Sequence, residues 1–177
     1  GTPSYSTDTA AIAETRILLP RNQVPEGIKH GDTLRVFVYR DSEDRAIATT
    51  TVPPLTLGET AVLTVKETST IGAFLDWGLA KDLLLPFKEQ TAKVKQGEKV
   101  LVALYIDKSG RLCATMHVYD YLSGNAPYQK DDRVTGIVYE HIDEFGTYVA
   151  VDDIYSALIP RREVVTPLRP GTVINAR

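Results

Sequence analysis

Apolar and polar residues alternate along the middle of the chain in a way that predicts short β-strands. The alternation is strongest over residues 99–106, where Val100, Val102, Leu104 and Ile106 share one face. A period of two residues is typical of a strand with one buried face. Similar runs predict further strands at 61–65, 72–77, 82–85 and 111–118, a turn at 107–110, and one helical turn between 87 and 96. Five short strands predict a small closed barrel, because closure removes exposed strand edges.

The same pattern recurs three times. Each copy has a proline that is followed eleven residues later by a glycine: Pro20 and Gly31, Pro86 and Gly97, Pro160 and Gly171. The first two copies continue with an Asp-x3-Arg element, Asp41–Arg45 and Asp107–Arg111. A repeat at nearly constant spacing indicates tandem structural units. We therefore predict an all-β chain of three modules, residues 1–57, 58–120 and 121–177, with the first and last incomplete.

These elements resemble the S1 RNA-binding domain, which is an OB-fold barrel. The resemblance rests on Gly72-Ala-Phe74 in the second strand, the Gly-Glu start of the fourth strand, and the Asp-x3-Arg element. Leu-Pro in place of the usual Leu-His, together with residues 28–41 and 48–54, resembles the bacterial conserved virulence factor B family, also called the YitL family. The resemblance implies three tandem five-stranded S1-like barrels. It further implies a cytoplasmic protein that binds single-stranded RNA and regulates gene expression and virulence factors, with a winged-helix domain in the full-length chain.

The resemblance also implies a set of RNA-contacting positions. The second copy supplies Phe74, Asp107 and Arg111, with Ile71 and Pro86 where the family has an aromatic residue and a histidine. The third copy supplies both aromatic residues. The expected RNA-binding residues are Phe74, Arg111, Asp107, Phe145, Tyr148, Arg161, Arg45 and Lys66, with Pro20, Asp41 and Pro160 at the corresponding groove positions. Proline replaces the histidine in all three copies, so we expect weaker binding than from a complete motif.

Each of these roles has a structural alternative. Strand alternation places Phe74 opposite Leu75, so we expect Phe74 and the corresponding Tyr148 to point outward, whereas Trp77 shares the parity of Leu75 and should be partly buried. The structural alternative for these aromatic residues is that their rings fill the interiors of the barrels. Arg45 and Arg111 contact nucleic acid, or else form salt bridges across the turn with the preceding aspartates. The lysines at 93, 95 and 99 form a small basic cluster, which we interpret as part of a solvated loop. Arg161 and Arg162 flank the groove of the third copy, where they contact RNA or remain solvated.

Composition and charge further limit the classes of function that fit this chain. The 20 Lys and Arg residues are outnumbered by 23 Asp and Glu, giving a net charge of −3. This balance argues against binding nucleic acid by bulk positive charge alone and leaves a local positive face open, so RNA binding should be modest, salt-sensitive and shared between modules. The hydrophobic fraction of 43% is that of a globular protein, and no apolar run is long enough to span a membrane. The acidic balance and the missing histidines also support a rival hypothesis, a protein-interaction scaffold.

Catalysis finds little support in the sequence. Cys113 is the single cysteine, which excludes an internal disulfide and a multi-cysteine zinc site, and we expect it to be a small core residue. The three histidines, at 30, 117 and 141, do not have the spacing of metal ligands. The chain also lacks a glycine-rich phosphate-binding loop. We therefore expect neither an enzyme nor a cofactor.

Overall fold

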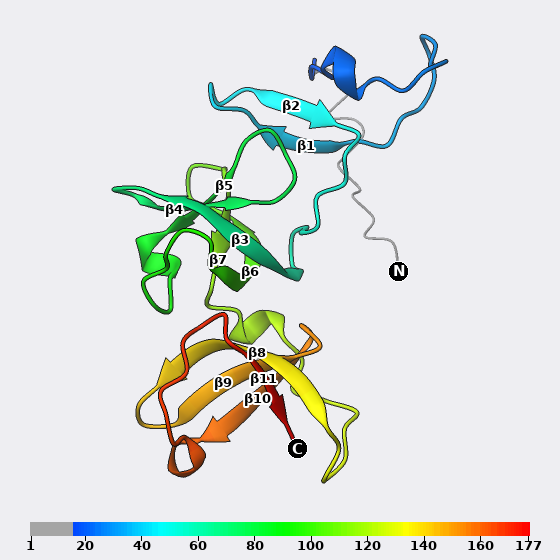
Figure 1. Cartoon of the computed structure of the whole chain (residues 1–177). Helices are drawn as coiled ribbons and strands as arrows, with labels where there is room; N and C mark the ends of the chain where they lie inside the picture. Colours follow the sequence, from blue (N-terminus) through cyan, green and yellow to red (C-terminus); the bar gives the residue numbers. More distant parts are fainter. Residues whose placement is uncertain (1–15) are drawn as a thin grey trace. The chain divides into compact units, whose positions relative to one another are not determined.

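The computed structural model describes residues 16–177, and regular structure within them is almost entirely β (Figure 1). These residues form three antiparallel sheets and four single turns of 3-10 helix. The chain divides into two compact units, residues 1–52 and 53–177. The start of the predicted first module, residues 1–15, lies outside the described residues.

The first unit contains a β-hairpin. Strand β1 (Phe37–Arg40) pairs with β2 (Ala46–Thr49), and the turn of helix η1 (Arg21–Gln23) precedes them. The side-chain oxygen of Gln23 accepts hydrogen bonds from Thr49 Oγ1 (2.8 Å) and Thr50 Oγ1 (3.0 Å). The described part of the first module therefore has two strands, not five.

The second sheet has the five strands that the alternation predicts. They are β3 (Thr60–Thr68), β4 (Gly72–Asp76), β5 (Leu83–Pro86), β6 (Lys99–Ile106) and β7 (Leu112–Thr115), in the order β5-β4-β3-β6-β7. Strands β5 and β7 at the two edges approach each other. Helix η2 (Phe87–Glu89) follows β5 and is tied to the end of β7, because Met116 N donates to Glu89 O (2.8 Å) and Thr115 Oγ1 donates to Glu89 Oε2 (2.7 Å). The sheet is thus a nearly closed barrel.

The interior of this barrel is filled by the predicted apolar face. Leu75, Leu85 and Val100 are completely buried. Ile106, predicted on the same face as Val100, is instead 53% exposed because it lies at the end of β6. Trp77 is 3% exposed and its indole nitrogen donates to Lys81 O (2.6 Å), which confirms its predicted burial. Cys113 is buried in β7, as predicted for a small core residue.

The third sheet repeats the first four strands of the second. It consists of β8 (Val134–Ile142), β9 (Gly146–Val151), β10 (Tyr155–Pro160) and β11 (Val173–Ala176), in the order β10-β9-β8-β11. Helix η3 (Tyr119–Tyr121) precedes this sheet, and η4 (Arg161–Glu163) follows β10. The described residues of the third module therefore form four strands where a complete barrel was expected to have five.

The sequence repeat is also a repeat of backbone conformation. Pro20, Pro86 and Pro160 each precede a 3-10 turn, with φ between −61° and −57° and ψ between 147° and 152°. The glycine eleven residues later has a φ of 91°, 87° and 93° in the three copies. Such positive φ values favour glycine. The second and third copies also share a β-bulge, after Val65 and Val138, whose carbonyl groups accept a hydrogen bond from Gly97 N (2.8 Å) and Gly171 N (2.7 Å).

A second glycine in each of these modules permits a close approach of two strands. Gly72 pairs with Pro86 and has a φ of 149°, and Gly146 pairs with Pro160 and has a φ of 132°. A Cβ atom on Gly72 would overlap the carbonyl oxygen of Leu85 and lie 2.9 Å from Pro86 Cα. The glycine of the Gly-x-aromatic motif is thus required where the second strand meets the third.

The second and third sheets share one hydrophobic cluster. The cluster consists of Leu101, Ala103, Val118, Ile137, Tyr139 and Ala150, with Leu122 and Tyr148 packed against it. A hydrogen bond from Thr91 Oγ1 to Tyr139 O (2.6 Å) joins the same two modules. The two modules therefore lie within a single packed unit.

Candidate nucleic-acid interface

The outer surface of β4 and β5 carries the aromatic residue that the sequence predicts there. Phe74 pairs with Leu84, while its neighbours Ala73 and Leu75 are completely buried. Phe74 is half-buried on the opposite face. Within residues 16–177 its ring has no aromatic partner. Phe74 and Pro86 are therefore on one outward-facing surface of the second barrel.

Tyr148 is at the corresponding position of the third sheet but has a different environment. It pairs with Leu158, as Phe74 pairs with Leu84. Its ring contacts Tyr119 edge-on (centroids 5.8 Å apart) and Tyr139 (5.9 Å), and it packs against the shared hydrophobic cluster. The expectation of an outward aromatic ring is met only in part. Strand alternation predicts on which face of β9 Tyr148 lies. It does not predict that Tyr119, from the segment after β7, packs on that face.

Phe145 and Arg161 are brought together in the third module. Arg161 N donates a hydrogen bond to Phe145 O (3.0 Å), although the two residues are sixteen positions apart. Phe145 is 58% exposed, and Arg161 and Arg162 are exposed in η4. This part of the module therefore presents an exposed ring beside two cations, a combination suited to stacking and phosphate contact.

The aspartate of each Asp-x3-Arg element shapes a hairpin turn. Asp107 Oδ1 accepts hydrogen bonds from Arg111 N (2.9 Å), Ser109 N (2.9 Å) and Ser109 Oγ (2.7 Å). The hydrogen bond from the Arg111 backbone is the main reason that the pKa of Asp107 is lowered. Asp41 accepts in the same way from Arg45 N (2.9 Å), and its pKa is also lowered. Both aspartates are thus engaged within their own turns. This resembles the structural alternative to RNA contact, in which the Asp-x3-Arg element makes local contacts across the turn.

The predicted cations differ in what they contact. Arg45 forms ion pairs with Asp41 (3.2 Å) and Glu43 (2.8 Å), which is the predicted alternative to RNA contact. Lys66 lies in the β-bulge and forms an ion pair with Asp82 (3.1 Å), which raises the pKa of its ammonium group. Arg111 is exposed at the end of its turn. Lys66 and Arg45 therefore have acidic neighbours that would compete with phosphate.

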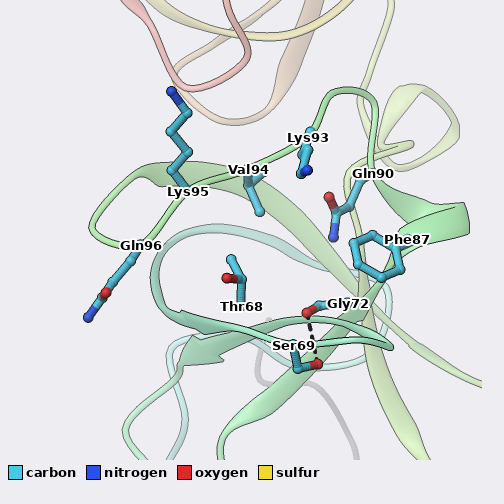
Figure 2. A pocket seen from close by; sticks show the side chains of 9 residues that line it. All are labelled: Thr68, Ser69, Gly72, Phe87, Gln90, Lys93, Val94, Lys95 and Gln96. Carbon is cyan, nitrogen blue, oxygen red and sulfur yellow. Dashed lines mark hydrogen bonds between the residues drawn. The ribbon is translucent and has the colours of Figure 1, made fainter.

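A surface cavity of about 340 Å³ lies beside the Gly72 turn of the second barrel (Figure 2). Thr68, Ser69 and Gly72 line one side of it, and the η2 region and the loop after it line the other with Phe87, Gln90, Lys93, Val94, Lys95 and Gln96. Phe87 is 49% exposed. Phe87 is not among the residues predicted from the sequence. Its local signal is an aromatic residue directly after the repeated proline, where the other copies have Arg21 and Arg161.

The remaining titratable groups do not assemble a metal site among residues 16–177. No cluster of three or more His, Cys, Asp or Glu side chains suited to a metal ion occurs there. His141 lies between Thr147 Oγ1 (2.9 Å) and Asp143 Oδ1 (3.0 Å). Burial raises the pKa of Cys113 to about 11, so this cysteine is a thiol at neutral pH. None of the helices described has the length and apolar character needed to cross a membrane.

Comparisons with known proteins agree with this architecture. The family model of the S1 domain matches residues 8–51 and 57–117. Over 173 residues the chain is 28% identical to the uncharacterized protein YitL of Bacillus subtilis, covering 93% of this chain and 58% of that protein. It is 31% identical over 91 residues to the conserved virulence factor B of Staphylococcus saprophyticus, covering 49% and 30% of the two chains. The chain thus spans little more than half of the first relative.

A solved structure shares the fold. The crystal structure of a multidomain protein with nucleic acid binding domains from Streptococcus pneumoniae superimposes with a TM-score of 0.65 at 21% identity. The match covers 91% of the present chain and 59% of the other.

Proposed function

The chain belongs to the S1 domain family, and we propose that it binds single-stranded RNA, without catalysis, through the outer surface of its second barrel. The observation that carries this proposal is Phe74, which the register of β4 and β5 places on the outer face between completely buried neighbours. An aromatic ring on such a face stacks on any base, since every base has a π-face. Nucleic acid binding in the pneumococcal protein with the same fold supports the proposal.

The third module adds a second contact in this proposal. Phe145 supplies an exposed ring and Arg161, whose backbone is hydrogen-bonded to that of Phe145, supplies an exposed cation, whereas Tyr148 contributes to packing between the modules. Because the net charge is −3, each contact is weak by itself, and affinity comes from several contacts along one strand. The boundaries 1–57, 58–120 and 121–177 remain our assignment of the three S1-like modules.

The biological setting is also a proposal. Similarity to the conserved virulence factor B supports a bacterial cytoplasmic protein that regulates gene expression, including virulence factors, with a winged-helix domain in the full-length protein. Crosslinking of RNA to the full-length protein in cells, followed by sequencing, identifies the bound transcripts. Recovery of no transcripts above an uncrosslinked control would contradict the regulatory role.

The binding proposal is tested with short labelled single-stranded RNAs by fluorescence anisotropy. Phe74→Ala is expected to weaken binding by roughly 5- to 100-fold, the loss of one stacked base. Val62→Ala serves as the control, because Val62 is an exposed apolar residue of β3 in the same sheet. Unchanged affinity for Phe74→Ala would refute the proposed surface. DNA of the same sequence tests the preference for RNA, and no RNA binding even at low salt would contradict the proposal and favour a protein-interaction scaffold instead.

A further inference from the structure

We propose that the cavity beside Gly72 is a separate subsite that holds one nucleotide of a single-stranded RNA, with the base on Phe87 and the phosphate on Lys93 and Lys95. The inference rests on the proposed RNA binding and adds a second location to it. The cavity lies between the β3–β4 turn and the loop of residues 93–96 (Figure 2). Phe74, by contrast, is on the outer face of β4 and β5.

The chemistry of the lining fits one nucleotide. A volume of about 340 Å³ is at the lower end of small-molecule sites and is suited to a single base with its sugar. Phe87 supplies a half-exposed ring for stacking. Gln90 Nε2 donates to Leu85 O (3.2 Å), which fixes the amide and leaves its side-chain oxygen to accept a hydrogen bond from a base.

The two lysines supply the positive charge. Lys93 and Lys95 are both exposed, and neither side chain forms an ion pair among residues 16–177. They differ in this respect from Lys66 and Arg45, whose carboxylate neighbours compete with phosphate. Lys93 lies on the side of Gln90 and Phe87, whereas the Lys95 side chain extends away from the cavity and would have to turn back to reach the same phosphate (Figure 2). Two unpaired ammonium groups on one loop near an exposed ring favour an anionic aromatic ligand.

The carboxylate nearest to this loop is already engaged. Glu98 Oε1 accepts from Lys95 N (2.9 Å) and from Arg169 Nη2 (3.0 Å). Arg169 Nη2 also donates to Lys93 O (3.0 Å). Arg169, from the third module, thus holds the main chain at Lys93 directly and at Lys95 through Glu98, while both lysine side chains are left exposed. Arg169 and Glu98 are positioning residues in this inference, because they order the loop before RNA binds.

Substitutions at Phe87 test the stacking half of the subsite. Fluorescence anisotropy with single-stranded RNA of about 12 nucleotides, within the length that one OB fold covers, measures affinity. Phe87→Leu is expected to lower affinity roughly 5- to 100-fold, and Phe87→Tyr is expected to retain it, since only tyrosine keeps a π-face. Equal affinity of the leucine variant and the unaltered protein would overturn the inference.

The salt dependence tests the phosphate half. Each phosphate contact on a single strand contributes a slope of about 0.7 to the dependence of log K on log salt. Because the subsite holds one phosphate, the double variant Lys93→Gln, Lys95→Gln should lower the slope by about 0.7, whereas Lys130→Gln, a change at an exposed lysine outside the cavity, should leave it unchanged. An unchanged slope in the double variant would refute the phosphate contact.

Glu98→Ala separates positioning from charge. Removing an acidic group strengthens RNA binding if only charge matters, whereas releasing the loop weakens it. We expect weaker binding with an intact Trp77 fluorescence spectrum, and stronger binding would exclude the positioning role. If Phe74→Ala impairs binding while the Phe87 and lysine variants do not, the subsite is refuted and the proposed function is retained. If the unaltered protein does not bind RNA, both are refuted.

Discussion

Replacement of Gly72 by alanine is expected to destabilise the second barrel through two separable effects. The φ of 149° is a backbone conformation that costs a residue with a Cβ atom about 1–3 kcal/mol. The new methyl group would also overlap Leu85 O and lie 2.9 Å from Pro86 Cα. These are main-chain atoms that cannot rotate away, so forced adjustment adds about 1–3 kcal/mol. The total is about 2–6 kcal/mol.

Gly97→Ala is the matched comparison. Gly97 also has a positive φ, of 87°, but a Cβ atom there would have no heavy atom within 4 Å. The expected cost is therefore the backbone cost alone, about 1–2 kcal/mol. Both variants gain similarly from a less flexible unfolded chain. The difference in the free energy of unfolding between the two variants thus measures mainly the overlap at β5.

Urea denaturation followed by tryptophan fluorescence measures both changes. Trp77 is the single tryptophan of the chain and is 3% exposed in the second barrel, so its emission reports on that barrel. With a urea dependence of about 2 kcal/mol per molar, Gly72→Ala should lower the midpoint by roughly 1–3 M. If Gly97→Ala proves equally or more destabilising, the claim that the close approach of β4 and β5 requires glycine is wrong.

Two further stability predictions use the same assay. The pKa of Asp107 is lowered in the folded protein by its hydrogen bonds in the turn. The contribution of Asp107 to the free energy of unfolding is therefore complete above its unfolded pKa and is lost as the pH falls through the lower, folded pKa. Asp107→Ala should destabilise by about 1 kcal/mol at neutral pH and by less near pH 3, and a pH-independent difference would contradict the turn role. Leu101→Ala in the shared cluster should cost about 2–5 kcal/mol and lower the stability of the second and third modules together. Hydrogen exchange of the β8 amides monitors the third module, and a separate, unshifted unfolding transition there would show that the cluster does not couple the two modules.

The second barrel was largely predictable because its local signals agree with one another. Alternation over 99–106 predicted β6, and Gly110, with a φ of 82°, is in the predicted turn after it. Pro86 marks the end of β5 and the start of η2 as the repeat suggested. Each of these features depends on residues within a few positions of one another, so the sequence pattern specifies them directly.

The candidate site was less predictable because it depends on contacts between distant residues. The packing of Tyr148 depends on Tyr119 and Tyr139, which are outside its strand. The order of the loop at Lys93 depends on Arg169, 76 positions later. A solvated loop was therefore the reasonable expectation for these lysines, since no local pattern indicates that the third module holds their backbone.

The hydrophobic cluster between the second and third sheets limits how the protein can be dissected into fragments. A cut near residue 120 would expose Leu101 and Ala103 on one fragment and Ile137 and Tyr139 on the other, all of which are at most 5% exposed in the structure. Newly exposed apolar surface of this kind promotes aggregation. The boundary between Val52 and Pro53 separates the two compact units and is the better place for a cut. For expression or limited proteolysis, residues 53–177 are therefore a fragment that keeps this cluster whole.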